Sequence, residues 1–130
     1  MHRSSVATCL LAGSFIGTLV IGFAGQARAA DVAGGERIFK TQCGACHAVE
    51  AGKNRIGPSM FGIVGRPSGA VEGFRYSAAN KSAALTWDTA TLDRYLINPR
   101  ETIPGTTMTY AGLRNDTQRA DVVAYLDSLK

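Results

Sequence analysis

The sequence predicts an all-α domain whose helices are joined by long loops, and three observations support this fold class. Near the C-terminus, apolar side chains recur at the spacing of one helix face, at Val122, Tyr125, Leu126 and Leu129. Between residues 52 and 73, six glycines and two prolines interrupt regular structure. No stretch of the sequence sustains the apolar–polar alternation of a half-buried strand.

The predicted helices cover residues 32–43, 77–84, 88–97 and a C-terminal stretch that follows residue 115. Asp31 and Asp88 act as N-caps, because a carboxylate there accepts a hydrogen bond from a free N–H of the first turn. Asn98-Pro99 ends the third helix, since a residue before proline avoids the α conformation. Asn115 and Gln118 resemble a capping box at the start of the last helix.

The first thirty residues have the pattern of a secretory signal peptide. Arg3 lies in a short polar region, an apolar core follows from Leu10 to Gly25, and Ala27-Arg28-Ala29 forms an A-x-A cleavage site. The alternative is an uncleaved membrane anchor, but the apolar run from Leu10 to Phe23 has 14 residues, and a spanning helix needs about 20. We therefore expect residues 1–30 to be removed after Ala29 or Ala30, and the protein to be exported to a bacterial periplasm.

Removal of this segment changes the charge of the chain. The full sequence has 14 Lys and Arg against 10 Asp and Glu, a formal net charge of +4. Arg3 and Arg28 would leave with the signal peptide, so residues 31–130 would carry +2. About 100 residues suffice for one small domain. So modest a charge gives no reason to expect nucleic acid as a partner.

The motif Cys43-Gly44-Ala45-Cys46-His47 predicts covalent haem attachment. Two thiols three residues apart lie on one side of a helical turn, where both can add to the vinyl groups of one porphyrin. The adjacent imidazole can then reach the iron. The motif therefore indicates one haem c, bound through Cys43 and Cys46.

Other interpretations of the two cysteines fit the sequence less well. A thioredoxin-like redox pair requires a neighbouring βαβ pattern, which residues 34–50 lack. A zinc site requires four ligands, and the remaining Cys9 and His2 lie in the predicted signal peptide. A disulfide would leave the adjacent His47 unexplained.

The second axial position of the iron has two methionine candidates. After cleavage the chain keeps one histidine, so two histidine ligands are excluded, and it keeps Met60 and Met108. A methionine in a protein usually packs in the core. Met108, however, follows Pro104-Gly105, which favours a type II turn that can direct a loop side chain inwards.

The chain resembles the class I cytochromes c, close to their mitochondrial-like bacterial type. The resemblance covers nearly all of residues 34–130 and rests on an ordered set of motifs. These are Gly35, Phe39, Cys43–His47, Gly57-Pro58, Gly65-Arg66, Gly73–Ser77, Ala79–Lys81, Thr86-Trp87, Tyr95–Pro99, Ile103–Thr106 with Met108, Ala111-Gly112 and Ala124–Leu126. It implies a small single-haem cytochrome c fold over residues 31–130, with crossing terminal helices and long loops around the haem.

The resemblance also implies roles for the iron ligands and the helix crossing. His47 would be the proximal ligand and Met108 the distal ligand. The Pro58 carbonyl would accept the other imidazole N–H. Where the terminal helices cross, Gly35 and Phe39 would pack against Val122 and Tyr125.

Five further residues receive roles around the haem from the same resemblance. Tyr76 and Trp87 would hydrogen-bond a buried propionate, and Arg66 nearby would offset its charge. Asn80 and Thr106 would help to hold a water molecule near the methionine sulfur.

Several positions depart from the pattern of the family. Met60 stands where leucine is usual, and Tyr110 stands where phenylalanine is common. Glu101 and Thr107 replace common lysines, and no lysine lies between Asn98 and Asn115. We therefore expect that no lysine of this loop replaces Met108 at alkaline pH.

The function implied is one-electron transfer between respiratory or other periplasmic redox partners, such as a bc1-type complex and a terminal oxidase, by a monomer that is not an enzyme. A modest basic rim for docking would comprise Lys53, Arg55, Arg100 and Arg114. Two alternatives remain open. One is a five-coordinate gas-binding or peroxidase-like haem protein, and the other is a dedicated electron-transfer subunit of a periplasmic dehydrogenase.

Overall fold

The computed structural model describes residues 28–130, and the first 27 residues of the predicted signal peptide lie outside the described residues. The helices are α1 (Val32–Gln42), α2 (Ala78–Ser82), α3 (Thr89–Ile97), α4 (Pro99–Thr102) and α5 (Asp116–Ser128). Residues 28–130 contain no strand beyond an isolated bridge between Pro67 and Thr86. The predicted all-α class is confirmed, and no helix in this part of the chain is long and apolar enough to cross a membrane.

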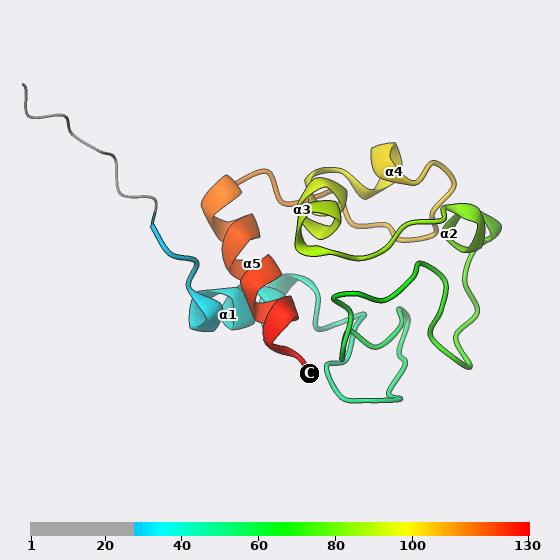
Figure 1. Cartoon of the computed structure of the whole chain (residues 1–130), viewed down its shortest axis with the longest axis horizontal. Coiled ribbons are helices and arrows are strands. Elements are labelled where there is room, and N and C mark those ends of the chain that lie inside the picture. The colour runs from blue at the N-terminus through cyan, green and yellow to red at the C-terminus, as the bar shows by residue number, and fades with distance from the viewer. Residues whose placement is uncertain (1–27) are drawn as a thin grey trace, which may run out of the picture.

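The two terminal helices cross and pack against each other at one side of the domain, and the long loops and α2 lie on the other side (Figure 1). A Cβ atom on Gly35 would overlap the backbone carbonyl oxygen of Asp121 and lie 2.9 Å from the Cβ of Tyr125. Only glycine therefore allows α1 to approach α5 this closely. One turn further along α1, the ring of Phe39 lies 5.6 Å from that of Tyr125. The predicted packing of Gly35 and Phe39 against α5 is confirmed.

The buried core extends from this crossing towards α3, which packs on both α5 and α4. Its members are apolar residues of the helices and of the loops between them: Phe39, Ile63, Trp87, Leu92, Tyr95, Leu96, Ile103, Leu113, Val122, Val123, Tyr125 and Leu126. Arg119 is the buried cation of α5, and it pairs with Asp93 at 2.7 Å and with Asp116 at 2.9 Å. The pair with Asp93 ties α3 to α5, and the pair with Asp116 lies within the first turn of α5.

The long segment between α1 and α2 is held by backbone hydrogen bonds to the chain before α3. Gly65 N–H donates to the Trp87 carbonyl at 3.0 Å, and Trp87 N–H donates to the Arg66 carbonyl at 2.9 Å. Ser68 N–H donates to the Leu85 carbonyl at 2.8 Å. The loop region is therefore ordered without regular secondary structure, as its glycines and prolines predict.

The helix boundaries confirm two predicted caps and correct a third. Asp88 accepts from Thr91 N–H at 2.7 Å, and Asn115 accepts from Gln118 N–H at 2.9 Å. Asp31 holds the N-cap position of α1, but its side chain makes no capping hydrogen bond. That carboxylate instead lies 3.6 Å from the guanidinium of Arg37.

Two other expectations about the helices need correction. The second helix, predicted over residues 77–84, is the shorter α2, because Ser77 is its cap and Ala84 takes a positive φ of 50°. Asn98-Pro99 ends α3 as predicted, but it also begins α4, a helix that the sequence pattern does not predict. Proline suits the first position of a helix, and Asn98 accepts from Glu101 N–H at 3.4 Å.

Candidate functional site

The cysteine motif lies at the end of α1, where the helix turns into the long loop. Cys43 is the C-cap of α1, and the N–H groups of Cys46 and His47 donate to its carbonyl at 3.0 and 2.9 Å. This turn brings both thiols and the imidazole to one cavity, and both thiols are free.

The chemistry of these cysteines argues against the other interpretations of the pair. Burial, with a smaller contribution from Cys46, raises the pKa of the Cys43 thiol to about 11. A catalytic redox pair needs a lowered thiol pKa instead. Within residues 28–130, no cluster of three His, Cys, Asp or Glu side chains is arranged to hold a metal ion, which a zinc site would require.

His47 is fixed by the loop that follows it. Its Nδ1 lies 2.8 Å from the carbonyl oxygen of Pro58, so the ring donates its Nδ1–H there and keeps the Nε2 lone pair free. Burial lowers the pKa of His47, although the bond to Pro58 opposes this. Gly57 packs against the ring so closely that a Cβ atom would overlap the imidazole. The imidazole is therefore neutral at pH 7 and held in one orientation.

The thiols and His47 face a cavity of about 350 Å³. Its walls include apolar core residues from α3, α5 and the long loop, among them Ile63, Leu92, Leu96, Val122 and Leu126. Nine of the ten predicted site residues line it: Cys43, Cys46, His47, Pro58, Tyr76, Asn80, Trp87, Thr106 and Met108. An apolar cavity with a few polar groups and two thiols at one edge fits a porphyrin.

Met108 reaches this cavity from the turn that the sequence predicts. Thr106 N–H donates to the Ile103 carbonyl at 3.0 Å, and Gly105 has a φ of +90°, as the third position of a type II turn requires. The hydroxyl of Tyr95 donates to the Met108 sulfur at 3.3 Å. Met60 lines the same cavity but lies in the long loop.

Tyr95 also lines the cavity, although it is not among the predicted site residues. Burial raises the pKa of its hydroxyl, and hydrogen bonding to Thr106 and Asn80 opposes that rise. Its ring lies 4.9 Å from that of Trp87, near an edge-to-face arrangement. The sequence does contain a signal for this role: Tyr95 shares the apolar face of α3 with leucines, and a buried hydroxyl needs a hydrogen-bond partner.

Tyr76 and Trp87, the residues expected to bind a propionate, both line the cavity. Burial lowers the pKa of Arg66 and raises that of Tyr76, and the two groups interact electrostatically. The Arg66 guanidinium donates to the Ser59 carbonyl at 3.0 Å. Arg66 is the one predicted site residue that does not line the cavity itself.

The family model for cytochrome c matches residues 32–130 of the chain. The chain belongs to the cytochrome c family. It is 50% identical to a cytochrome c of Chlamydomonas reinhardtii over 102 residues, which cover 78% of this chain and 91% of that protein. It is also 48% identical to the cytochrome c of Nigella damascena over 102 residues, 78% of this chain and 92% of that protein.

A solved structure supports the same assignment. Cytochrome cH from Methylobacterium extorquens superimposes with a TM-score of 0.72 at 39% identity, over 76% of this chain and 99% of that chain. Members of the cytochrome c family are electron carriers that bind haem c covalently through a cysteine pair. In this chain Cys43 and Cys46 occupy that position, and the cavity beside them fits the group.

Proposed function

We propose that this cytochrome c is an exported, monomeric, single-haem electron carrier whose iron is ligated by His47 and Met108. The observation that supports this proposal best is that both side chains line one cavity together with Cys43 and Cys46. When bound, the haem supplies a one-electron iron couple. The side chains of the protein then determine which ligand positions are filled and how strongly each ligand is held.

His47 is prepared for its role by its hydrogen bond. The Pro58 carbonyl occupies Nδ1 at 2.8 Å, which leaves Nε2 as the ligating atom. A hydrogen bond of this kind fixes the ring and increases its basicity as a ligand. Burial keeps the imidazole neutral at pH 7, so no proton has to leave before it ligates.

Met108 would provide a soft sulfur as the second ligand, and the Tyr95 hydroxyl donates to that sulfur at 3.3 Å. A thioether favours reduced iron relative to a second imidazole, so this ligand pair gives a higher potential. If His47 and Met108 both ligate the iron, no position would remain for a small-molecule substrate. The arrangement therefore supports electron transfer and not catalysis of bond chemistry.

The polar groups around the cavity would stabilise the charges of the haem. Tyr76 and Trp87 line the cavity where they can donate to a propionate, with Arg66 beside Tyr76 to offset its charge. Asn80 and Thr106 lie near the Tyr95 hydroxyl, where they can position a water molecule next to the Met108 sulfur. These groups would tune the potential and would not take part in ligation.

We also propose that the carrier docks through a modest basic rim. Its members are exposed side chains: Lys53, Arg55, Arg100 and Arg114. Ile56 lies directly after Arg55 and lines the cavity that also holds His47 and Met108. Because the residue is 80% exposed, it would add an apolar contact to a docked partner. Acidic docking sites on membrane complexes such as a bc1-type complex and a terminal oxidase would suit this rim. The association rate should fall as salt increases, and a rate independent of salt would contradict the proposal.

Export is the last part of the proposal. The family match begins at residue 32 and α1 begins at Val32, so the first thirty residues precede the domain. They would serve as a signal peptide that is removed after Ala29 or Ala30 in a bacterial periplasm. The intact mass of the purified holoprotein tests this, since retention of residues 1–28 would contradict it.

The ligand assignment is tested by the oxidised visible spectrum of two variants. A sulfur–iron bond produces a long-wavelength charge-transfer band, and Met108→Ala should abolish that band. Met60→Leu is the matched control, because Met60 lines the same cavity, and it should keep the band. If the unaltered protein lacks the band, the five-coordinate alternative is favoured; if Met60→Leu loses it, the ligand is misassigned.

A further inference from the structure

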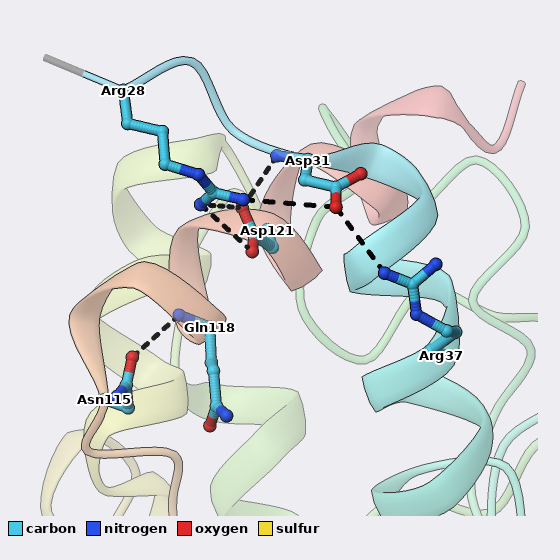
Figure 2. A network of polar contacts seen from close by, with 6 residues as sticks. All are labelled: Arg28, Asp31, Arg37, Asn115, Gln118 and Asp121. Atoms are coloured by element: carbon cyan, nitrogen blue, oxygen red, sulfur yellow. Dashed lines mark hydrogen bonds and ion pairs between the residues drawn. The ribbon is translucent and has the colours of Figure 1, made fainter.

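The carboxylate of Asp121 is buried at the crossing of α1 and α5. Its side chain is 8% exposed, and its Oδ1 accepts the backbone N–H of Asp31 at 2.7 Å. Figure 2 shows the guanidinium of Arg28 joined by dashed lines both to this carboxylate and to that of Asp31. One guanidinium nitrogen of Arg28 lies 3.3 Å from Oδ1 of Asp121, and the other lies 4.0 Å from Oδ2 of Asp31. Within residues 28–130, no other cation lies within ion-pair distance of Asp121.

This arrangement conflicts with the proposed processing of the chain. Arg28 lies on the N-terminal side of both proposed cleavage positions, so the mature protein would lose the cation that pairs with Asp121. A buried charge whose partner is removed strongly destabilises a fold. Without Arg28, the charged groups around the Asp121 carboxylate are Asp31 and Arg37 from the start of α1 and Asp121 itself from α5. Together they carry a net charge of −1.

Cleavage itself creates a replacement cation. Water adds across the peptide bond, so the released segment ends in a carboxylate and the new N-terminal amine takes up a proton. An α-amine has an ordinary pKa of about 7.7–8.0 and is mostly charged at pH 7. The Asp31 nitrogen already lies 2.7 Å from Asp121, and the Ala30 nitrogen is one residue away. Cleavage after Ala30 therefore turns the Asp31 nitrogen itself into the ammonium group beside the buried carboxylate, and cleavage after Ala29 puts the ammonium group one residue before that nitrogen.

We propose that Asp121 is the binding site for the α-ammonium group of the mature N-terminus, which replaces Arg28 when the signal peptide is removed. The site lies at the tightest contact between the terminal helices. Gly35, whose N–H donates to the Asp31 carbonyl at 2.9 Å, packs on the backbone of Asp121 itself. The new ion pair would fix the first turn of α1 on α5. The inference rests on the proposed export, but it is independent of the axial ligands.

The pKa of the N-terminal amine in the mature holoprotein tests the proposal. It can be measured from the pH dependence of amine acylation, followed by mass spectrometry. An ion pair with Asp121 should raise this pKa, so that at pH 8 the amine reacts about tenfold more slowly than in Asp121→Asn. Asp127→Asn is the matched control on the same helix, because Asp127 is more exposed and pairs with Lys130 at 3.6 Å. Equal rates in the unaltered protein and in Asp121→Asn would overturn the proposal.

A second measurement avoids reliance on the folding of Asp121→Asn. Acetylation of the N-terminus of the unaltered holoprotein removes the cation and leaves Asp121 in place. Acetylation should reduce the folding equilibrium constant of the unaltered protein about tenfold at pH 7. It should reduce that of the control variant Asp127→Asn by the same factor. An unchanged urea midpoint after acetylation would overturn the proposal. So would an intact mass showing that Arg28 stays in the mature chain, although that result leaves the assignment of Met108 untouched.

Discussion

His47 and Met108 face the same cavity, but the chain holds them in different ways. His47 follows a covalent attachment point, donates to a backbone carbonyl at 2.8 Å and packs against Gly57. Met108 follows an exposed Pro-Gly turn; its sulfur accepts from the Tyr95 hydroxyl at 3.3 Å, and its N–H donates to the Thr106 hydroxyl at 3.3 Å. The part of the cavity wall that carries His47, here called the histidine side, is fixed by backbone groups. The part that carries Met108, the methionine side, depends on weaker hydrogen bonds from side chains. The methionine should therefore be the first ligand to be released.

The largest effect is expected on the histidine side. Gly57→Ala places a Cβ atom where the imidazole of His47 lies, so the ring or the loop must move. Overpacking of this kind should lower the free energy of unfolding of the holoprotein by about 3 kcal/mol. Denaturant unfolding measures this loss. Unchanged stability would show that the histidine side is less rigid than the structure indicates.

A smaller effect is expected from the turn on the methionine side. Gly105→Ala forces a side chain into a φ of +90°, at a cost of about 1–2 kcal/mol. Because the strain lies beside Met108, the sulfur–iron band should disappear at lower urea than the global unfolding transition. Gly62→Ala is the matched control, with a φ of +60° and no neighbour within 4 Å of an added Cβ. If the band is lost at the same urea concentration in Gly105→Ala and in Gly62→Ala, the methionine side is not less stable than the rest of the fold.

The Tyr95 hydroxyl should contribute less than the turn. Tyr95→Phe removes the hydrogen bond to the Met108 sulfur, at a cost of about 1 kcal/mol. Imidazole should then displace Met108 at a lower concentration, which the loss of the sulfur–iron band reports. Tyr125→Phe, at the crossing of α1 and α5, should leave the displacement unchanged. Equal displacement in the unaltered protein and in Tyr95→Phe would show that the hydroxyl does not hold the sulfur.

The smallest effect concerns the cap of α3, the helix that carries Tyr95. Hydrogen bonding from the Thr91 N–H holds the pKa of Asp88 below its ordinary value. The ionised cap therefore stabilises the folded state fully above the unfolded pKa, and this stability is lost as the pH falls through the folded pKa. Asp88→Asn keeps a capping side chain without the charge, so its stability should depend less on pH in the acidic range. If the free energy of unfolding varies with pH in the same way in the unaltered protein and in Asp88→Asn, this assignment is contradicted.

Local features of the site could be predicted from the sequence, because each depends on residues close together in the chain. Cys43, Cys46 and His47 lie within five consecutive residues, and the caps Asp88 and Asn115 act on N–H groups three residues away. The turn before Met108 follows from the proline and glycine themselves. Resemblance to a family added the longer-range expectations, such as the bond between His47 and Pro58.

Features that depend on tertiary contacts could not be predicted in this way. The bond from Tyr95 to Met108 requires α3 and a loop to meet. Asp31 is the N-cap of α1, and its carboxylate also lies 4.0 Å from the guanidinium of Arg28 and 3.6 Å from that of Arg37, contacts that its place in the sequence does not predict. The pair between Arg28 and Asp121 joins residues 93 positions apart, and one of them lies in a segment predicted to be removed. Sequence patterns carry no signal for such a contact.

The central claim is that His47 and Met108 fill the two axial positions of one haem. It is tested most directly by an NMR spectrum of the reduced holoprotein with carbon-13-labelled methionine methyl groups. A methyl group bound at the iron lies over the porphyrin and is shifted far upfield by the ring current. We predict one such signal, retained in Met60→Leu and therefore belonging to Met108. An upfield signal that disappears in Met60→Leu, or the absence of any upfield methyl signal, would contradict the account.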